Sequence, residues 1–308
     1  MNIRDELVLR DPGAVALRIA EFLTAQMNLY HRDGLILGLS GGVDSALGAF
    51  LAVQAAGASH VTLLFMPERD TSPTSRVHAE LVAHTLGVPL TTKSITPLVA
   101  ATGAYRLEPP ARFVPRRVQE RYVEGRARAL QADQRSTFLR TLRGGDGVAE
   151  LRRSNAYLHV KHRLRMVLWY FSAELDNLLV VGNCNLSEKL TGYFIRYGDS
   201  ASDVDPLAGL YKTQVLQLAR HVGVPEEIVA QAPSPDLAPG LTDESVLQMT
   251  YDLLDQILWG LRHGMDPTVL ARETGAAAGD IAYVQELMRL SQAMRELPPS
   301  PDLADLVR

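Results

Sequence analysis

The chain of 308 residues is long enough for one large α/β domain or two small ones, and its 46% hydrophobic and 21% charged residues predict a packed core rather than global disorder. Its net charge of −4 argues against a nucleic-acid-binding protein, and the single cysteine, Cys184, excludes an internal disulfide or a cysteine-based zinc site. The first residues lack the apolar core of a signal peptide and no apolar run reaches the length of a membrane span, so we expect a soluble cytoplasmic protein that does not associate with membranes.

The first part of the chain alternates between helical and strand-like patterns. The predicted helices cover 14–30, 46–56 and 75–86, and the predicted strands cover 35–39, 61–65, 90–95 and 178–182. The strand segments are short and almost wholly apolar, which is typical of strands buried on both faces of a parallel sheet. Alternation of this kind indicates βαβ units. The predicted fold class is therefore α/β, with a Rossmann-like parallel sheet flanked by helices.

The part of the chain after Lys212 is predicted to be helical. The expected helices cover 213–222, 243–262, 267–273 and 280–295. Asp243, Asp266 and Asp280 are the expected N-terminal caps, because short acidic side chains accept hydrogen bonds from the first free N–H groups of a helix. We expect a single domain over residues 1–308 with a helical C-terminal part.

Residues 97–153 have a different composition. This stretch contains twelve arginines, no lysine and six acidic residues, so its net charge is +6. We interpret it as an inserted arm that is partly helical from Val118 to Leu142. A solvated helix is one explanation for the charge. The alternatives are that the arm supplies positive charge toward a phosphorylated substrate, or that it packs in a dimer.

A glycine-rich turn lies between the first predicted strand and the helix at 46–56. Its residues are Gly38, Leu39, Ser40, Gly41, Gly42, Val43, Asp44 and Ser45. Glycines let the backbone turn sharply, and the free N–H groups and dipole of the following helix attract an anion. Asp44 beside an anion suggests a bridging Mg²⁺, which binds carboxylate and phosphate oxygens together. The turn predicts a phosphate site, and an ordinary strand-to-helix turn is the alternative.

The string from Ser40 to Ser45 is not a Walker loop, because no Gly-Lys-Ser/Thr closes it. It resembles the signature of the N-type ATP pyrophosphatases, which have the adenine nucleotide alpha hydrolase-like fold. The resemblance implies that ATP is cleaved to AMP and pyrophosphate and that this loop holds the pyrophosphate.

A second string, from Leu178 to Leu218, narrows the resemblance. It includes Gly-Asn-Cys-Asn-Leu-Ser-Glu at 182–188 and Tyr-Lys-Thr at 211–213, and it is preceded by Arg-Leu-Arg-Met at 163–166 and followed by Pro-Ser-Pro-Asp-Leu at 233–237 and Thr-Asp-Glu at 242–244. These motifs, in this order, resemble the NAD synthetase family. The resemblance covers residues 14 to 264 without the arm.

The resemblance assigns roles residue by residue. It implies that the ATP phosphates are held by the loop at 38–45, and that ATP also contacts Asn183, Lys212 and Ser234. It implies that Mg²⁺ is bound by Asp44 and Glu188, and that deamido-NAD is held by Arg165, Arg196, Asp199 and Asp203. Asp44 and Lys212 would be the catalytic residues.

Several of these residues could instead have purely structural roles. Glu188 and Lys212 would be solvated helix residues, and Asp199 and Asp203 would cap turns. A nucleophilic role for Cys184 is not supported, since no histidine or acid is placed by spacing to activate it.

The reaction that the resemblance implies is ATP-dependent amidation of deamido-NAD to NAD. The substrate carboxylate would attack the α-phosphorus of ATP, forming an acyl-adenylate and releasing pyrophosphate, and ammonia would then displace AMP. A lysine and metal ions near the α-phosphate would stabilise the charge that develops there. The resemblance also implies a homodimer.

Several residues depart from the family pattern. His159 stands where the family has asparagine, Asn183 replaces threonine and Arg196 replaces lysine. The acidic cluster expected after Met66-Pro67 is replaced by Glu68-Arg69-Asp70, and no His-Lys pair occurs near the C-terminus. Two alternatives follow from these departures: a related amide ligase that acts on a different carboxylate, or a homologue that binds nucleotide without turnover.

The nitrogen source follows from where the motifs lie. Only 39 residues precede Ser40, and the single cysteine lies within the synthetase portion. We therefore expect no glutaminase domain, and ammonia that is either free or supplied by a separate protein.

Overall fold

Four parallel strands form the centre of the molecule. The computed structural model of the chain describes residues 2–107, 118, 121, 125, 137–234, 242–296 and 298–301. The strands are β1 (Gly34–Gly38), β2 (Val61–Phe65), β3 (Leu90–Thr92) and β4 (Leu178–Val180). They are hydrogen-bonded in the order β3-β2-β1-β4. This confirms the predicted α/β class and all four predicted strands.

Helices cover both faces of this sheet. One face packs against α3 (Val43–Ala56) and α4 (Pro73–Leu86), with α2 (Pro12–Leu29) behind α3; the other packs against α5 (Thr96–Ala101) and α8 (Ala149–Leu175). Side chains alternate between the two faces along a strand. Leu35 and Leu37 accordingly join the core under α2 and α3, whereas Ile36 joins the core under α8. Burial on both faces explains why these strands are apolar throughout.

The order of the strands reverses at β1. The chain runs from β1 to β2 on one side, while β4 pairs with β1 on the other side. In parallel α/β sheets, ligands bind beyond the carboxyl ends of the strands at such a reversal point. The segments after β1 and β4 meet there, and they carry the two strings that the sequence singles out.

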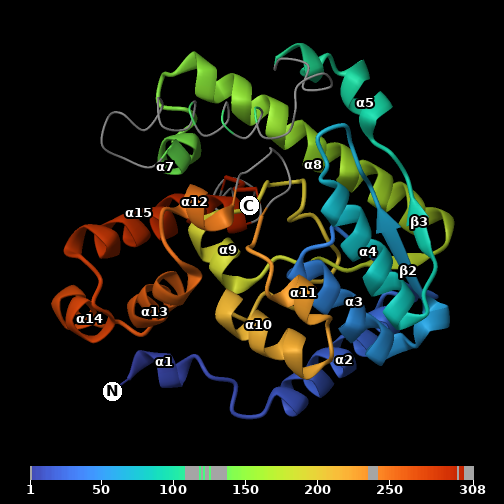
Figure 1. Cartoon of the computed structure of the whole chain (residues 1–308), viewed down its shortest axis with the longest axis horizontal. Coiled ribbons are helices and arrows are strands. Elements are labelled where there is room, and N and C mark those ends of the chain that lie inside the picture. Colours follow the sequence, from blue (N-terminus) through green and yellow to red (C-terminus); the bar gives the residue numbers. More distant parts are fainter. Residues whose placement is uncertain are drawn as a thin grey trace, which may run out of the picture.

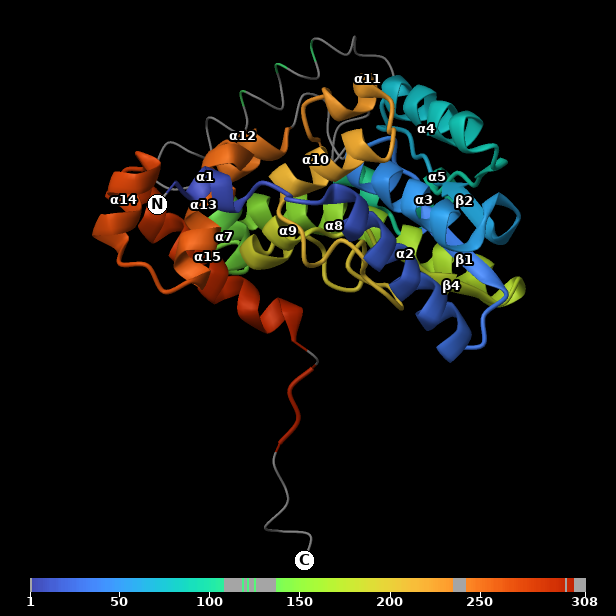
Figure 2. The same ribbon diagram turned by 90° about the horizontal axis from the view of Figure 1, so that it is seen from below.

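Helices from the C-terminal part form a second hydrophobic core. Its side chains come from α9 (Leu186–Thr191), α12 (Asp243–Leu247), α13 (Tyr251–Arg262), α14 (Pro267–Thr274) and α15 (Ala278–Arg295). The apolar side chains of α10 (Lys212–His221) and α11 (Glu226–Val229) instead join the first core, with α2 and α3. Figures 1 and 2 both show α13, α14 and α15 grouped beside the α/β part. The N-terminal helix α1 (Ile3–Glu6) buries Ile3 in this second core and packs against α13.

The predicted helix over 243–262 is wrong in one respect, because two helices occupy that span. Gln248 adopts a left-handed conformation with φ of 55° and ends α12, and the Thr250 side chain caps α13 by accepting from the Leu253 N–H. Two predicted caps are also displaced. Asp243 is the first residue of α12, after Thr242 as cap, and Asp280 lies inside α15. Asp266 caps α14 as predicted.

The predicted arm at 97–153 is described only in part. Its described elements are α5, the short 3₁₀ helix η2 (Ala104–Arg106), α7 (Thr137–Leu142) and the first turn of α8. Most of 108–136, including most of the helix predicted from Val118, lies outside the described residues. Arg140 pairs with Asp146 at 3.7 Å and Arg143 with Glu286 at 2.8 Å. These two arginines are therefore neutralised within the fold, and the three interpretations of the arm stay predictions.

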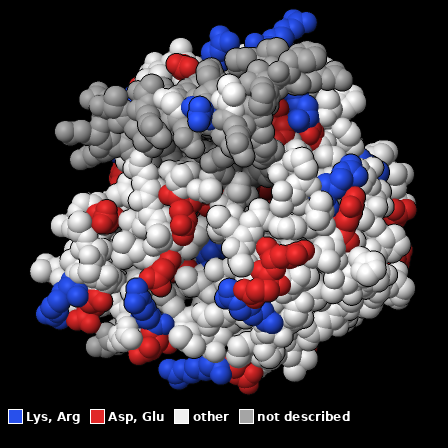
Figure 3. Space-filling view, in the orientation of Figure 1, with Lys and Arg blue, Asp and Glu red and all other residues white. Residues whose placement is uncertain are grey.

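Acidic and basic side chains lie interspersed on the described part of the face shown in Figure 3. Among the described helices, none is long and apolar enough to cross a membrane.

Candidate active site at the phosphate loop

The glycine-rich turn at residues 38–45, called the phosphate loop after its predicted ligand, connects β1 to α3. Gly41 has a φ of 88°, and a Cβ at this position would lie 2.4 Å from the Ser75 carbonyl oxygen. Only glycine fits such a backbone and such a close approach. The Ser45 hydroxyl donates to the Gly42 carbonyl at 2.9 Å and accepts from the Ser40 N–H at 3.1 Å. The loop is thus held by its own serines, at the N-terminus of a 14-residue helix.

Asn183, from the segment after β4, lies beneath this loop. Its Nδ2 donates to the Gly38 carbonyl at 3.3 Å. Its buried Oδ1 has no hydrogen-bond partner in the part of the chain that the structure describes, and a Cβ at Gly48 would come within 2.2 Å of it. The glycine in α3 therefore makes room for the amide. The structure brings Asn183 to the loop, as its predicted contact with ATP requires.

Three of the predicted site residues lie close together beside the loop. Asp44, in the first turn of α3, forms an ion pair with Lys212, the first residue of α10. Glu188 of α9 lies 3.9 Å from the same Lys212 Nζ. Asn185 donates from Nδ2 to Asp44 Oδ1 at 2.9 Å. Segments that follow β1 and β4 thus converge with α10 on one point.

Asn185 is a site residue that sequence reasoning missed. It caps α9 in a capping box: its Oδ1 accepts from the Glu188 N–H at 3.0 Å, and Glu188 Oε2 accepts from the Asn185 N–H at 3.2 Å. The sequence signal was the spacing Asn-x-x-Glu, which is typical of a helix start. The box orients Glu188 so that its second carboxylate oxygen faces Lys212.

The cluster around Lys212 contains more acidic side chains than basic ones. Burial, and then the negative charge of Asp44, raise the pKa of the Glu188 carboxyl well above its usual value. Burial opposes the charge on Lys212, but Asp44 and Glu188 outweigh it, and the pKa of the lysine is raised. A third carboxylate, Asp243, adds to the excess; it accepts from the Tyr193 and Tyr251 hydroxyls at 3.0 and 3.1 Å. The cluster holds more acid than its one lysine neutralises.

A magnesium ion fits this donor set. Asp44 and Glu188 provide hard carboxylate oxygens, and their mutual repulsion is what a divalent cation would relieve. Among the described residues, no group of three or more histidine, cysteine or acidic side chains is arranged to hold a metal without other ligands. Mg²⁺ binds in this manner where one or two carboxylates share it with phosphate oxygens. The arrangement suits a metal that arrives with ATP.

Comparison with known proteins identifies the family. The sequence model described as NAD synthase matches residues 15–137 and 136–298. The chain belongs to the NAD synthase family. The prediction from the motifs is thereby confirmed, together with the predicted class of enzyme, a ligase that uses ATP to form a carbon–nitrogen bond.

Curated members of the NAD synthase family are similar over most of the chain. The NH(3)-dependent NAD(+) synthetase of Thermotoga neapolitana is 44% identical over 80% of this chain and 84% of its own length. The Methanocaldococcus jannaschii enzyme of the same name is 33% identical over 93% of this chain and 95% of its own length.

Solved structures of similar proteins share the fold. The NMN synthetase of Francisella tularensis superposes with a TM-score of 0.70 and 25% identity, over 94% of this chain and 98% of that chain. The NH3-dependent NAD synthetase of Campylobacter jejuni, in complex with the nitrate ion, superposes with a TM-score of 0.67 and 21% identity, over 96% and 100%. At that identity the second match supports the fold alone.

The residues predicted to hold the acid substrate lie on α8, in the case of Arg165, and on the segment between α9 and α10, in the case of the other three, and each has a partner within the fold. Arg165 donates to the Met66 carbonyl at 3.0 Å, and Arg196 donates to the Ala293 and Glu296 carbonyls at 3.2 and 2.9 Å. Asp203 accepts from the Val180 N–H and the Tyr170 hydroxyl at 2.9 and 3.1 Å. Their role in substrate binding stays a prediction.

Asp199 has the most unusual environment of these four residues. It accepts from the Ile195 N–H at 2.7 Å, and its other oxygen lies 3.7 Å from His162 Nδ1. Burial raises the pKa of the Asp199 carboxyl to about 6, although backbone hydrogen bonds oppose the shift. Burial, with Arg165 nearby, lowers the pKa of His162 well below its usual value. His162 therefore stays neutral near neutral pH, and Asp199 is the group of this pair whose pKa lies closest to neutrality.

Ser234 and Cys184 are the remaining residues for which the sequence made a prediction. Ser234 is exposed, and residues 235–241 after it lie outside the described residues. The Cys184 thiol is buried and faces the Asp199 carbonyl at 3.5 Å, and burial raises its pKa well above the usual value. A raised thiol pKa disfavours the nucleophilic thiolate. The structure therefore agrees with the exclusion of Cys184 as a nucleophile.

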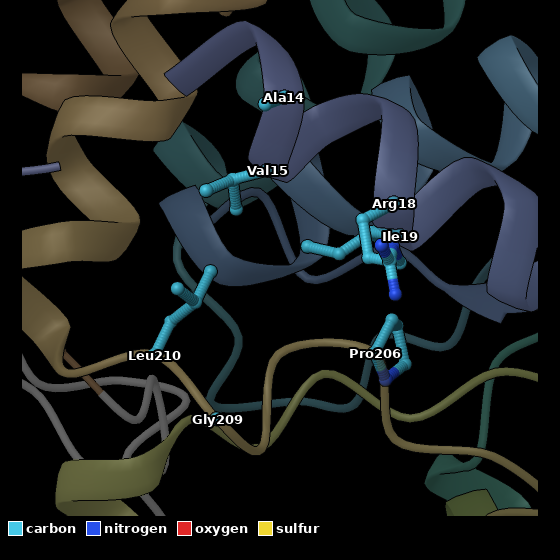
Figure 4. Close-up of a pocket in the computed structure, with 7 residues that line it drawn as sticks. All are labelled: Ala14, Val15, Arg18, Ile19, Pro206, Gly209 and Leu210. Carbon is cyan, nitrogen blue, oxygen red and sulfur yellow. The ribbon is translucent and has the colours of Figure 1, made fainter. Parts of the chain in front are cut away.

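A separate apolar pocket of about 380 Å³ lies between α2 and the segment 206–210 (Figure 4). It is lined by Ala14, Val15, Arg18, Ile19, Pro206, Gly209 and Leu210. None of these residues belongs to the phosphate loop or to the cluster around Lys212. The chemistry of the side chains, rather than the depth of a cavity, locates the candidate active site.

A second buried lysine lies at the loop after β2. Lys161 Nζ is 2.8 Å from Glu68 and 2.9 Å from Asp70, and Tyr105 donates to Glu68 at 2.9 Å. The Tyr157 hydroxyl donates to Asp70. Glu68 and Asp70 stand where the family's acidic cluster was expected, and the structure shows that a lysine from α8 neutralises them.

Proposed function

We propose that this chain converts deamido-NAD to NAD with ATP and ammonia, and that Asp44, Glu188 and Lys212 carry the ATP chemistry. The observation that supports this proposal best is the convergence of these three residues at the phosphate loop, in a chain 44% identical to a relative named NH(3)-dependent NAD(+) synthetase. Asn183 and Ser234 would add contacts to ATP, and Arg165, Arg196, Asp199 and Asp203 would hold the acid.

The geometry suits adenylation followed by amide formation. The loop amides and the positive end of α3 receive the pyrophosphate, and Lys212 stabilises charge that develops as the substrate carboxylate attacks the α-phosphorus. Pyrophosphate leaves and an acyl-adenylate remains. Ammonia then attacks the acyl carbon, AMP departs, and Asp199, whose pKa lies at about 6, takes up the proton that the nitrogen loses. Mg²⁺ on Asp44 and Glu188 would neutralise phosphate charge.

A direct assay tests the proposal. Purified protein is incubated with ATP, Mg²⁺, ammonium and deamido-NAD, and the formation of NAD and pyrophosphate is measured. We expect both products in equal amounts and neither when deamido-NAD is omitted. Turnover of ATP with another acid, and none with deamido-NAD, would refute the choice of substrate. No ATP cleavage with any acid would favour a homologue that binds nucleotide without turnover.

An amide ligase for a different acid is the second candidate. Two observations favour it: the structural similarity to the NMN synthetase of Francisella tularensis, and the replacements at Asn183 and Arg196. An enzyme that makes NMN by amidation would start from the corresponding carboxylic acid. Supplying this mononucleotide acid and deamido-NAD to the same preparation, separately and then together, gives a ratio of kcat/KM values that decides between the two.

We also propose that the enzyme is a homodimer. Val167, Phe171 and Leu175 are exposed to 53%, 57% and 66% and are spaced four residues apart on α8, so they form an apolar stripe along one side of that helix. A second copy that packs on this stripe would remove it from water. Sedimentation of wild type and of F171E distinguishes the cases: a dimer that F171E dissociates supports this face, and a wild-type monomer contradicts the proposal.

A further inference from the structure

A buried carboxylate outside the phosphate loop connects the helices that carry Glu188 and Lys212. Asp255 of α13 is fully buried and uses both carboxylate oxygens. Its Oδ1 accepts from the Ser187 hydroxyl at 2.5 Å, and its Oδ2 accepts from the Thr213 N–H at 2.8 Å. Ser187 belongs to α9 and Thr213 to α10, and the three helices pack against one another (Figure 1).

These bonds satisfy the N–H groups of the first two residues of α10. The first N–H groups of a helix have no partner within the helix. Tyr211, the N-cap residue of α10, supplies no side-chain hydrogen bond to them. The Lys212 N–H instead donates to Ser187 Oγ at 2.9 Å, and the Thr213 N–H donates to Asp255. Side chains of α9 and α13 therefore fix the position of the backbone at Lys212.

The Ser187 hydroxyl is the point at which Lys212 and Glu188 are linked. Glu188 follows Ser187 directly, so the oxygen that binds the Lys212 backbone is one residue away from the carboxylate that faces the Lys212 ammonium. A serine oxygen accepts in a defined direction only when its own hydrogen is committed elsewhere. Asp255 accepts that hydrogen and thereby sets the orientation of the hydroxyl.

We propose that Asp255 is a positioning residue for the adenylation step: through Ser187 it holds Lys212 and Glu188 at the spacing that the ATP phosphates require. This inference rests on the proposed function of the same site. Displacement of a reacting group by about 1 Å costs on the order of 100-fold in rate, so a change at this second layer reaches the chemistry.

A purely structural role predicts something different. If Asp255 and Ser187 only stabilised the fold, any equally buried hydroxyl between α9 and its neighbours would matter as much. The chain offers such a matched residue. Ser291 of α15 is fully buried, and its hydroxyl donates to the Leu190 carbonyl of α9 at 2.7 Å. Both Ser187→Ala and Ser291→Ala thus remove one buried hydroxyl that bonds α9 to another helix.

The experiment compares these two variants with wild type. Pyrophosphate release with ATP, Mg²⁺, ammonium and deamido-NAD gives kcat and KM, and denaturant unfolding gives stability. We expect S187A to lower kcat roughly 10- to 100-fold with the KM for deamido-NAD unchanged, whereas S291A keeps kcat within about twofold at a similar loss of stability. Equal kcat values for the two variants would overturn the inference.

The carboxylate itself is tested with Asp255→Asn, which keeps the shape. The amide oxygen still accepts from the Thr213 N–H, but the amide nitrogen cannot accept from Ser187. We expect D255N to lower kcat as S187A does, and the double variant to be no slower than either single one, because both changes break the same link. If the losses in kcat of the two single variants added up in the double variant, Asp255 and Ser187 would not act through the same link.

Binding of Mg·ATP, measured by calorimetry on the same proteins, separates this inference from the proposed function. If wild type binds Mg·ATP but turns over no acid, the proposed substrate fails. The inference then stands only if S187A weakens Mg·ATP binding about tenfold while S291A leaves it within twofold. Equal affinities of the two variants would overturn it.

Discussion

Two lysines of this chain are fully buried beside pairs of carboxylates, yet their surroundings are opposite in kind. Lys161 lies within 3 Å of both Glu68 and Asp70, and each carboxylate is also bound by a tyrosine hydroxyl. A buried ion pair is stable when further hydrogen bonds satisfy the remaining lone pairs. This cluster is therefore complete as it stands, and nothing in it calls for a ligand.

The cluster around Lys212 is incomplete by the same criterion. Lys212 contacts Asp44, but Glu188 lies 3.9 Å away and its pKa is raised by burial and by Asp44. The ion-pair partner of Lys212, Asp44, also belongs to the phosphate loop. A buried lysine alone therefore does not mark an active site. The distinguishing feature at Lys212 is an excess of buried acid, which a bound divalent cation would balance.

The largest expected effect is a loss of folding stability when the cluster around Lys161 is broken. Lys161→Met leaves Glu68 buried without a cation and leaves Asp70 paired with Arg69 alone, so it should lower the free energy of unfolding by about 3–5 kcal/mol. Lys212→Met should cost less, because Glu188 takes up a proton readily in place of the lost charge. Urea unfolding of the two variants measures both values. A larger loss for K212M than for K161M would contradict the comparison.

The next effect concerns turnover at the incomplete cluster. Asp44→Asn keeps the size of the side chain but removes the charge that pairs with Lys212 and that would bind Mg²⁺. We expect kcat for pyrophosphate release to fall about 100- to 1,000-fold, the range for loss of one preorganised electrostatic contact. Asp70→Asn, in the other cluster, serves as the control and should change kcat far less in the folded protein. Retained turnover in D44N would refute the assignment of Asp44.

The fold could be predicted from the sequence because its strands are buried on both faces. Runs such as Leu35–Leu37 carry no polar residue and stand between glycine-rich turns, which is what a central parallel strand requires. The break inside 243–262 was not predicted. Gln248 takes a left-handed conformation there, and glutamine is not a residue whose identity signals such a turn.

The site was predicted where the chemistry is local in sequence. Asp44 lies within the glycine-rich turn, and Glu188 and Lys212 lie within the family string. Asp255 and Ser187 could not be found in that way, because their contact joins residues 68 positions apart and each looks like an ordinary helix residue. Only the packing of α9, α10 and α13 brings them together.

A trade-off between stability and activity is expected at Glu188. Burial makes its ionised form costly, so Glu188→Gln should raise the free energy of unfolding of the ligand-free protein by about 1 kcal/mol. The same variant should lose activity and need more Mg²⁺ for half-maximal turnover. Glu68→Gln should do the reverse and destabilise the protein, because Glu68 is paired with Lys161 and Tyr105. Equal signs for the two stability changes would break the contrast between the clusters.

The smallest effect is a pH dependence on α8, two residues from Lys161. Burial, and then Arg163, lower the pKa of His159 to about 4, whereas the unfolded chain titrates near 6.5. Between pH 7 and 5 the unfolded state therefore binds a proton that the folded state does not, and stability falls as the pH falls. His159→Asn, which introduces the residue usual in the family, should remove about 1 kcal/mol of that loss of stability, a value reduced for partial exposure.

Denaturant unfolding of H159N and wild type at pH 8, 7 and 5 measures this difference. The variant and wild type should differ by the same amount at pH 8 and 7, where the histidine is mostly neutral in both states. An unchanged loss between pH 7 and 5 in H159N would show that other groups on this helix, His162 first among them, set the acid sensitivity.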